Sequence, residues 1–375
     1  MKILLGGIPL GCDNIGDEAI IACVVKMLKE SLPGVELTVA TADPATAERL
    51  GVGTVPAFGF AGTSLDGFAE AVRRHDAYIW CGATGLSDYP HVGLALLEAA
   101  QDEGVPTFIW GVGMDDELNP VFFKAQGKRR ALLKMLGLVG WYEQRLRARL
   151  ARRIAAALPQ CKGVWLRDPQ SVAMLARTGF AGAGVSADTA ILLGEAGKSG
   201  KSENSVERCL GLCISTQRQV ADLDGVRSLI AAVRESGAKV LGIPMNVKTD
   251  RALLERLGVE CIPGTTPESV VEASAQCNVV LSSRLHLLIL AADAGTPGLG
   301  IARGSKLANW LANFGECVVG SVYDCNWGKV TERVLGMLKD SGNWSERRVA
   351  AYGRLNARLE SARRDLVAKI LDCAK

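Results

Sequence analysis

Arg284 and His286, two positions apart, are the residues of this sequence whose types and spacing best suit chemistry. They follow the apolar run 278–282 and precede the helix-like run 287–294. Arginine offers a planar fork of donors to a carboxylate or phosphate, and histidine exchanges a proton near neutral pH. On a strand, residues two positions apart project to one face. The pair therefore suits an anionic substrate that needs acid catalysis, whereas the alternative is a histidine with a structural role in the core.

Ser283 and Lys306 could complete such an anion site. Ser283 directly precedes Arg284, and Lys306 follows the next predicted strand, 298–301. A lysine at this place would add a second positive charge, and its alternative role is that of a solvated loop residue. Ser283, Arg284 and Lys306 are therefore the candidates for substrate binding in the second half of the chain.

The segment 11–20 is a second candidate, because it follows the first predicted strand and opens the first predicted helix. Asn14 and Gly16 are its candidates for substrate binding, because glycine here would let backbone N–H groups approach a bound anion or sugar. The structural alternative explains the same residue types: Asn14 caps the helix, and Asp17 in the first turn favours the helix dipole. Spacing alone leaves both interpretations open.

Glycine turns follow two further predicted strands. Gly82, after strand 77–81, either leaves the backbone open to a ligand or forms a tight turn. Gly111 and Gly113 end another strand without a third glycine in register, so a dinucleotide fingerprint is not supported. The run 197–202 resembles a phosphate-binding loop but lacks its first glycine and a preceding strand, and it is expected to be linker.

Arg167 and Asp168 lie at the end of one more predicted strand, and Asp188 follows later in the chain. A proline directly after Asp168 suits the first turn of a helix. We expect Arg167 to pair with Asp168 or Asp188 as scaffolding rather than to act in catalysis.

Short apolar runs alternate with amphipathic stretches in both halves of the chain. The predicted strands are 2–5, 35–40, 77–81, 107–110, 163–167, 209–214, 239–243, 278–282 and 298–301. The predicted helices are 16–31, 91–103, 169–177, 225–236, 249–257, 266–274, 287–294 and 344–374. This alternation predicts parallel sheets, whose ligands bind at the carboxyl ends of the strands. The motifs above all follow predicted strands.

The length of 375 residues predicts two domains, because single cores stop growing near roughly 250–300 residues. We expect an N-terminal domain over 1–195, a linker over 194–205 and a C-terminal domain over 206–343. The helix 344–375 is expected to pack back on the N-terminal domain. The predicted fold class is α/β, with two Rossmann-like doubly wound parallel-sheet domains and a C-terminal helix.

Composition excludes several classes of protein. A net charge of +3 does not argue for nucleic acid, and no apolar run reaches the roughly 18 residues of a membrane span. The first ten residues are expected to form a strand rather than a signal peptide. The 11 cysteines form no C-x-x-C pairs, so we expect reduced thiols in a cytoplasmic protein and no metal.

The segment 124–153 is strongly basic, with ten lysines and arginines and a single acid, Glu143. Trp141 and Tyr142 lie among these charges. A solvated helix face is the ordinary interpretation. The alternative is peripheral contact with anionic lipid or a lipid-linked diphosphate, because basic helices with aromatic residues favour anionic interfaces.

In this order, the motifs resemble those of the polysaccharide pyruvyl transferase family over roughly residues 1 to 320. The matching pieces are 14–20 (NIGDEAI), the turn at Gly82, 111–113 (GVG), Arg167-Asp168-x-x-Ser171, 187–188 (AD) and 283–286 (SRLH). The chain departs from the family in its thinner glycine run at 81–85. It also departs at 303–306, where only Lys306 is kept.

This resemblance implies a GT-B-like fold and transfer of a pyruvyl group from phosphoenolpyruvate to a sugar or lipid-linked saccharide acceptor, with release of phosphate. Phosphoenolpyruvate is then a co-substrate, and no cofactor or metal is expected. Arg284 and His286 would belong to the phosphoenolpyruvate site, with His286 as candidate acid and Asp17 as candidate base. The competing classes are a GT-B glycosyltransferase or nucleotide-sugar epimerase, and a non-catalytic sugar-binding protein of the same fold.

Overall fold

The computed structural model describes residues 1–194, 207–215, 220 and 222–373. The predicted linker, from residue 195 on, and the run 197–202 lie outside the described residues. The chain divides into two compact units. Unit 1 comprises Met1–Leu10, Val24–Asp188 and Arg358–Lys375, and unit 2 comprises Gly11–Cys23 and Thr189–Ala357.

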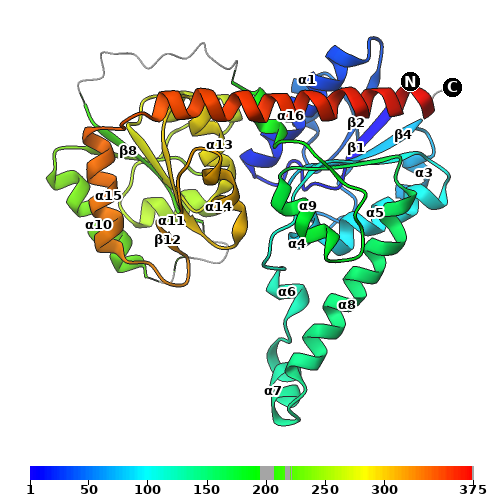
Figure 1. The fold of residues 1–375 in the computed structure, drawn as a ribbon, viewed down its shortest axis with the longest axis horizontal. Coiled ribbons are helices and arrows are strands. Elements are labelled where there is room, and N and C mark those ends of the chain that lie inside the picture. The colour runs from blue at the N-terminus through cyan, green and yellow to red at the C-terminus, as the bar shows by residue number, and fades with distance from the viewer. Residues whose placement is uncertain (195–206, 216–219, 221, 374–375) are drawn as a thin grey trace. The chain divides into compact units, whose positions relative to one another are not determined.

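The sheet of unit 1 has seven parallel strands in the order β3-β2-β1-β4-β5-β6-β7 (Figure 1). The strands are β1 (Lys2–Gly6), β2 (Glu36–Thr41), β3 (Gly53–Pro56), β4 (Ala77–Cys81), β5 (Thr107–Val112), β6 (Gly163–Leu166) and β7 (Gly184–Val185). Every residue of β4 and β5 is buried. Strands of a parallel sheet are covered on both faces, which explains why these read as continuous apolar runs.

Helices surround this sheet and complete the core of unit 1. They are α2 (Pro44–Leu50), α3 (Phe68–Val72), α4 (Gly85–Asp88), α5 (Pro90–Asp102), α6 (Pro120–Phe123), α7 (Gly127–Met135), α8 (Val139–Ala157) and α9 (Pro169–Ala176), with a short 3₁₀ turn, Leu158–Gln160. Trp80 of β4 lies at the centre of the core, fully buried. Its indole packs so closely on α5 that a Cβ on Gly93 would lie 2.1 Å from it. Glycine at this position therefore serves packing.

The sheet of unit 2 has five parallel strands in the order β12-β11-β10-β8-β9. They are β8 (Cys209–Cys213), β9 (Lys239–Gly242), β10 (Val279–Ser282), β11 (Gly298–Ala302) and β12 (Gly320–Ser321). The chain winds from β8 outward to β9 and then returns to build β10, β11 and β12 on the other side. The topological switch point, where ligands of such sheets bind, therefore lies at the carboxyl ends of β8 and β10.

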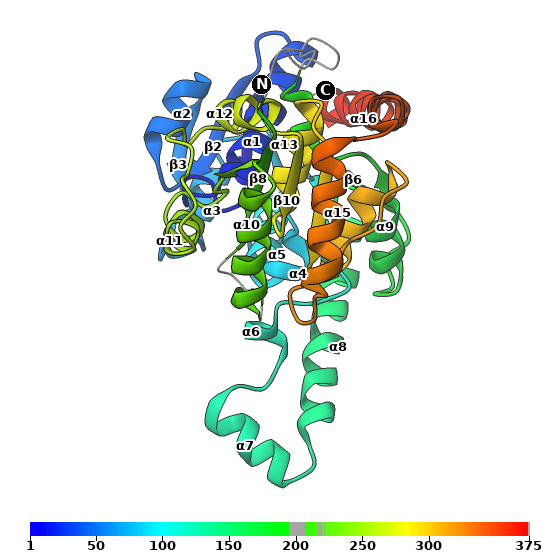
Figure 2. The same cartoon turned by 90° about the vertical axis from the view of Figure 1, so that its left-hand side faces the viewer.

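The helices of unit 2 pack on both faces of its sheet (Figure 2). They are α10 (Leu223–Glu235), α11 (Thr249–Arg256), α12 (Pro267–Ala275), α13 (Leu285–Asp293), α14 (Ser305–Ala312) and α15 (Trp327–Lys339), with a 3₁₀ turn, Thr189–Leu192. Two long helices are shared between the units: α1 (Ile15–Ser31) and α16 (Trp344–Cys373). Two doubly wound parallel sheets and a C-terminal helix confirm the predicted fold class.

The grouping of residues differs from the predicted ranges in two respects. The predicted N-terminal domain extends to 195, but the second stretch of unit 2 begins at Thr189. Residues 11–23, also placed by the sequence in the N-terminal domain, belong to unit 2 as well. The reason is a pair of backbone hydrogen bonds: Ile15 N donates to Met245 O (2.9 Å), and Val247 N donates to Asp13 O (3.1 Å). Of the C-terminal helix, residues 358–373 belong to unit 1.

Candidate functional site

The candidate site of unit 2 is built at the switch point of its sheet. The hydroxyl oxygen of Ser283, after β10, accepts a hydrogen bond from Ser215 N, after β8 (2.8 Å). Ser283 N donates to Cys213 O (3.0 Å). Ser283 thus joins the carboxyl ends of the two strands, and its predicted contact with a substrate stays a prediction.

Arg284 and His286 do not share a strand face. The strand β10 ends at Ser282, Arg284 is the extended residue that precedes α13 (φ −107°, ψ 125°), and His286 lies in the first turn of that helix. The Ser282 hydroxyl holds this bend, accepting from Arg284 N (2.8 Å) and donating to Arg284 O (2.9 Å). The geometric reason predicted for their common orientation is therefore wrong.

Arg284 forms a bidentate ion pair with Asp250 of α11. Its Nε lies 3.0 Å from Asp250 Oδ2, and its Nη2 lies 2.9 Å from Oδ1. The Asp250 side chain is fully buried, and Arg284 keeps 17% of its side-chain surface exposed. Burial lowers the pKa of the Arg284 guanidinium, but the Asp250 carboxylate outweighs this effect and raises the pKa above its usual value. Arg284 is therefore a fixed cation with one side open.

Asp250 is a residue of the candidate site that the sequence did not reveal. It also accepts a hydrogen bond from Asn246 N (2.9 Å), which anchors the loop between β9 and α11. Its place in the first turn of a helix has a common explanation, because acids there favour the helix dipole. The local sequence does not show whether an acid at this position only stabilises the helix dipole or also pairs with a distant arginine.

The loop before α1 lies against the loop after β9. Besides the two backbone hydrogen bonds of the Asn14–Asn246 bridge, Lys248 Nζ forms an ion pair with Asp13 Oδ2 (2.8 Å). Asp13 has a positive φ of 60°, a conformation tolerated by aspartate. The predicted motif at 11–20 is thereby brought into the same unit as Arg284 and His286.

The backbone of Gly16 lies directly against the side chain of His286. A Cβ at this position would lie 2.3 Å from Nδ1 and 2.5 Å from Cγ of His286. No side chain can occupy that space while the imidazole stays where it is. The predicted role of Gly16, exposing backbone to a ligand, remains a prediction, and its observed role is to admit the His286 ring.

Asp17 is a buried carboxyl on which several basic side chains act. Its side chain accepts a hydrogen bond from Asn14 Nδ2 (2.6 Å), and Asn14 Oδ1 accepts from Gly16 N (3.3 Å). Burial raises the pKa of Asp17 to about 6, although His286, Asn14, Arg284 and Lys306 each lower it. A carboxyl with such a pKa is poised to give or accept a proton near neutral pH.

Lys306 lies in the first turn of α14, the helix that follows β11, and its positive charge acts on Asp17. Cys12 lies close enough to Asp17 for the two side chains to affect each other electrostatically. Burial, followed by the negative charges of Asp17 and Asp13, raises the pKa of the Cys12 thiol, which keeps it protonated. The structure therefore brings Asn14, Asp17, Arg284, His286 and Lys306 together, from three separate stretches of chain.

Replacing Asp17 by asparagine should stabilise the protein in a pH-dependent way. The pKa of Asp17 rises from 3.8 to about 6 on folding, so the native state holds this proton more tightly than the unfolded state. The stabilisation that comes from the protonated Asp17 carboxyl is complete at low pH and is lost as the pH rises through about 6. Asparagine cannot ionise and loses nothing. We expect the free energy of unfolding of Asp17→Asn to rise relative to that of the native protein between about pH 4 and pH 6. Above that range the difference should reach about 3 kcal/mol.

Urea denaturation at a series of pH values measures this difference. A constant offset between the two proteins across the range would contradict the raised pKa of Asp17. The exposed carboxyl of Asp224, replaced in the same way, serves as a control in the same unit and should show no such trend.

The remaining predicted residues lie in unit 1. Gly82 follows β4 with a φ of 56°, and Gly82 N donates to Trp110 O (2.7 Å). Arg167 is buried after β6, with Nε 3.4 Å from Asp168 Oδ2 and Nη1 3.7 Å from Asp188 Oδ2. The predicted pairing of Arg167 is confirmed, with both carboxylates at once. The role of Gly82 toward a substrate stays a prediction.

Among the described residues, no group of three or more histidine, cysteine, aspartate or glutamate side chains is arranged to hold a metal ion. Within the same part of the chain, no helix combines the length and apolar character needed to cross a membrane.

Solved structures with the same fold include nucleotide-sugar enzymes. A UDP-GlcNAc 2-epimerase from Neisseria meningitidis bound to UDP-GlcNAc aligns with a TM-score of 0.63 and 12% identity, covering 99% of this chain and 100% of that one. A glycotransferase of kitacinnamycin gives 0.59 and 13%, covering 98% and 99%. An Anabaena protein in complex with UDP-glucose gives 0.57 and 14%, covering 99% of both chains. At these identities the likeness shows the fold, which is GT-B-like.

No curated protein matches the sequence. The polysaccharide pyruvyl transferase family model matches residues 14–305. This range begins at Asn14, includes the Arg284–His286 bend and ends at residue 305, so it contains every residue of the cluster except Lys306. The match covers well over half of the sequence, and the chain belongs to the polysaccharide pyruvyl transferase family.

Proposed function

We propose that this protein transfers the pyruvyl group of phosphoenolpyruvate to two hydroxyls of a sugar, in a polysaccharide or lipid-linked precursor, forming a ketal and releasing phosphate. Family membership supports pyruvyl transfer in general. The observation that carries the specific proposal is Asp17, a buried carboxyl with a pKa of about 6 among Arg284, His286 and Lys306.

The charges of this cluster suit the donor. Phosphoenolpyruvate carries a carboxylate and a phosphate, and its binding requires fixed cations. The Asp250 carboxylate engages Nε and Nη2 of Arg284 and leaves the Nη1 side of the fork for an oxyanion. Lys306, in the first turn of α14, adds a second positive charge.

The proposed reaction balances without a cofactor. An acid protonates the methylene carbon of phosphoenolpyruvate, and the first sugar hydroxyl attacks the resulting oxocarbenium-like centre as its proton passes to a base. Phosphate leaves from the tetrahedral intermediate, and the second hydroxyl closes the ketal as it loses its proton. The sugar hydroxyls release two protons in total. One replaces the proton given to the methylene carbon, and the other is taken up by the departing phosphate. His286 is the candidate acid and Asp17 the candidate base.

Ligand-induced stabilisation tests the donor. A ligand that binds only the native state stabilises it and so raises the melting temperature. At a ligand concentration a hundred times its Kd, the free energy of unfolding increases by about 2.7 kcal/mol. We expect phosphoenolpyruvate to raise the melting temperature of the native protein and to have a smaller effect on Arg284→Lys, because lysine keeps the charge but loses the fork.

Two control ligands sharpen the test. Inorganic phosphate and pyruvate, given separately, should shift the melting temperature less than phosphoenolpyruvate. A shift with UDP-sugars and none with phosphoenolpyruvate would favour a nucleotide-sugar enzyme, the class of several structural neighbours. Binding of sugars without phosphate release from phosphoenolpyruvate would favour a non-catalytic protein.

A further inference from the structure

Unit 1 carries a helical projection, here called the arm, formed by residues 120–149. It contains α6, α7 and the N-terminal part of α8, and both views show α7 standing away from the sheet of unit 1 (Figures 1 and 2). None of the nine residues of α7, all of them described, is buried. The helix α8 buries Leu150, Ile154 and Ala157, all in its C-terminal half, and Leu146 packs partly against the core. Within the arm only Phe123 and Ala125 are buried, so the arm is held at its base and exposed beyond it.

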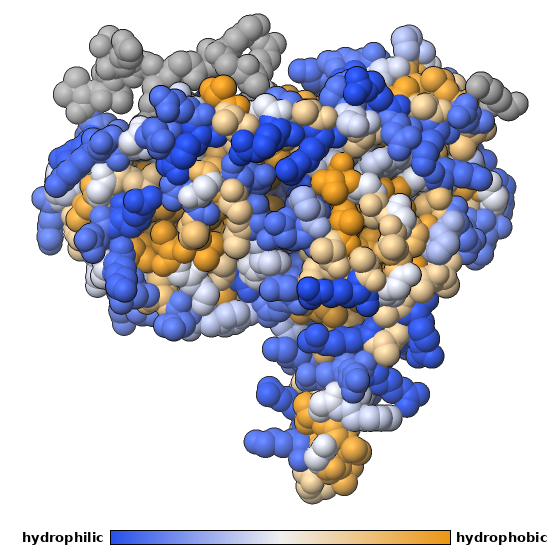
Figure 3. Space-filling model, viewed as in Figure 1, coloured by the Kyte–Doolittle hydropathy of each residue, from blue (hydrophilic) through white to orange (hydrophobic). Residues whose placement is uncertain are grey.

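Large apolar side chains are exposed at the end of the arm. Their exposed fractions are 53% for Leu132, 76% for Met135, 56% for Leu136, 41% for Leu138 and 55% for Trp141. Most of the large apolar side chains that the described residues expose lie in the arm, and Figure 3 shows their hydrophobic surface at its end. Contiguous exposed apolar surface of this kind marks an interaction site.

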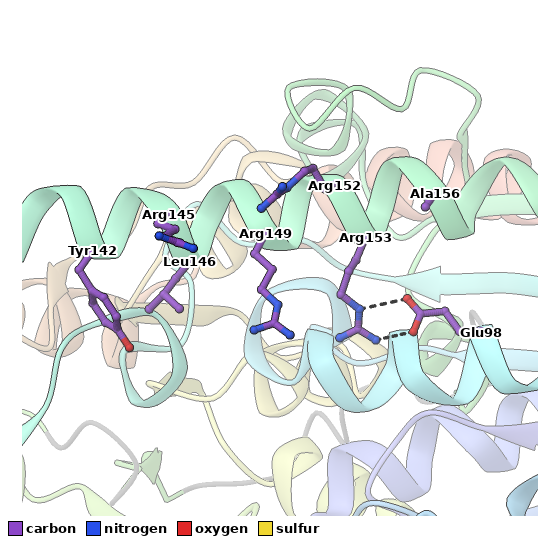
Figure 4. A pocket seen from close by; sticks show the side chains of 8 residues that line it. All are labelled: Glu98, Tyr142, Arg145, Leu146, Arg149, Arg152, Arg153 and Ala156. Atoms are coloured by element: carbon purple, nitrogen blue, oxygen red, sulfur yellow. Dashed lines mark hydrogen bonds and ion pairs between the residues drawn. The ribbon is translucent and has the colours of Figure 1, made fainter.

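Basic side chains flank this apolar end. The segment 124–153 contains ten lysines and arginines and one acid. Four arginines of α8 line a surface groove of about 670 Å³ between α8 and α5 (Figure 4). Glu98 binds Arg153 through two hydrogen bonds, of 3.0 and 2.6 Å. No ion pair within the described residues engages the other three, Arg145, Arg149 and Arg152.

The aromatic residues lie between the apolar end and the arginines. Arg145 lies 5.4 Å from the ring centre of Trp141, and Arg129 Nη1 donates to the Tyr142 hydroxyl (2.9 Å). Along the arm, the apolar tip is followed by the aromatic residues and then by the arginines that form no ion pair in the described part of the chain. This is the order of environments in a bilayer surface, from acyl chains through the interface to the phosphate layer.

From this order we propose that the arm docks onto an anionic lipid surface. Leu132, Met135 and Leu136 enter the interface with Trp141, and the arginines of the groove contact lipid phosphates. A second copy of the chain is a poorer occupant, because the ten like charges would repel one another. The proposal is independent of the transferase reaction and is tested without substrate.

Vesicle sedimentation with the full chain tests the charge requirement. We expect binding to phosphatidylcholine vesicles that contain phosphatidylglycerol and weak binding to pure phosphatidylcholine. Each basic residue near an anionic surface contributes roughly fivefold, so replacing Arg145, Arg149 and Arg152 by glutamine should weaken binding about 100-fold. The matched control replaces Lys26, Lys162 and Arg177, exposed residues of unit 1 outside the arm, by glutamine with the same change in charge.

A second variant tests the apolar end. Met135→Ser with Leu136→Ser alters exposed side chains only, so the protein should fold normally and bind anionic vesicles about tenfold more weakly or worse. Equal loss in the charge control, no binding to anionic vesicles, or equal binding to neutral ones would overturn the proposal. Concentration-dependent self-association that the serine variant abolishes, without vesicle binding, would show a protein interface instead.

The chain contains its own probe of insertion. Of its seven tryptophans only Trp141 is exposed, at 55%, and the other six are buried. Brominated acyl chains quench tryptophan on contact, so they should quench the native protein on anionic vesicles and leave Trp141→Phe unaffected. Equal quenching of both proteins, or of neither, would contradict entry of the arm into the interface.

Discussion

Replacing His286 by alanine is expected to lower the turnover of phosphoenolpyruvate by about 10²–10⁴-fold, the usual contribution of a positioned acid or base. The fold should survive, because alanine suits the first turn of α13 and Asp17 can hold a proton when the imidazole is removed. Phosphate release measures turnover, and free imidazole should restore part of it if the ring moves a proton. Unchanged turnover would remove His286 from the mechanism.

Two further variants separate chemistry from position. His75→Ala removes a histidine of unit 1, whose Nδ1 lies 2.9 Å from Ala71 O, and should leave turnover unchanged. Gly16→Ala keeps His286 but displaces its ring, because the new Cβ would lie 2.3 Å from Nδ1. We expect Gly16→Ala to lose activity that imidazole does not restore. Full activity in this variant would show that the position of the ring is not critical.

Replacing Asp250 by alanine is expected to destabilise unit 2 by about 3–5 kcal/mol, the effect of removing one partner of a buried ion pair. Arg284 would lose both of its hydrogen bonds to the carboxylate, and Asn246 N would lose its acceptor. Urea denaturation measures the loss. Since the arginine is also released from its fixed orientation, the KM for phosphoenolpyruvate should rise even at temperatures where the variant is folded.

Asp224 provides the matched control for this prediction. It forms an ion pair with Arg227 in the same unit, but its side chain is 91% exposed. Asp224→Ala should change stability by less than about 0.5 kcal/mol. Equal effects of the two substitutions would mean that the Asp250–Arg284 pair contributes no more than a surface contact. A double variant, Asp250→Ala with Arg284→Met, should recover part of the loss because it leaves no unpaired charge.

The sequence by itself determined the architecture and the places where chemistry could occur. Continuous apolar runs such as 77–81 and 278–282 predict buried parallel strands, and the structure has β4 and β10 there. Ligand sites of such sheets lie at the carboxyl ends of strands, so the polar residues directly after each run were candidates. This reasoning depends only on local pattern, and it found Asp17, Arg284, His286 and Lys306. The strands β3, β7 and β12 were missed. Three of the four residues of β3 are exposed, so it shows no apolar run, and β7 and β12 have only two residues each.

Tertiary structure alone decided which of these residues meet. Asp250 holds Arg284 from 34 positions away, and the His286 ring from the second half of the chain packs on Gly16 near its start. Both contacts depend on how the strands of unit 2 are ordered and on residues 11–23 joining that unit, and neither is encoded in a local period. Burial raises the pKa of Asp17 for the same reason, since a side chain loses water only when distant elements close over it. Local pattern thus predicts where an element ends, and long-range packing sets what its last residues touch.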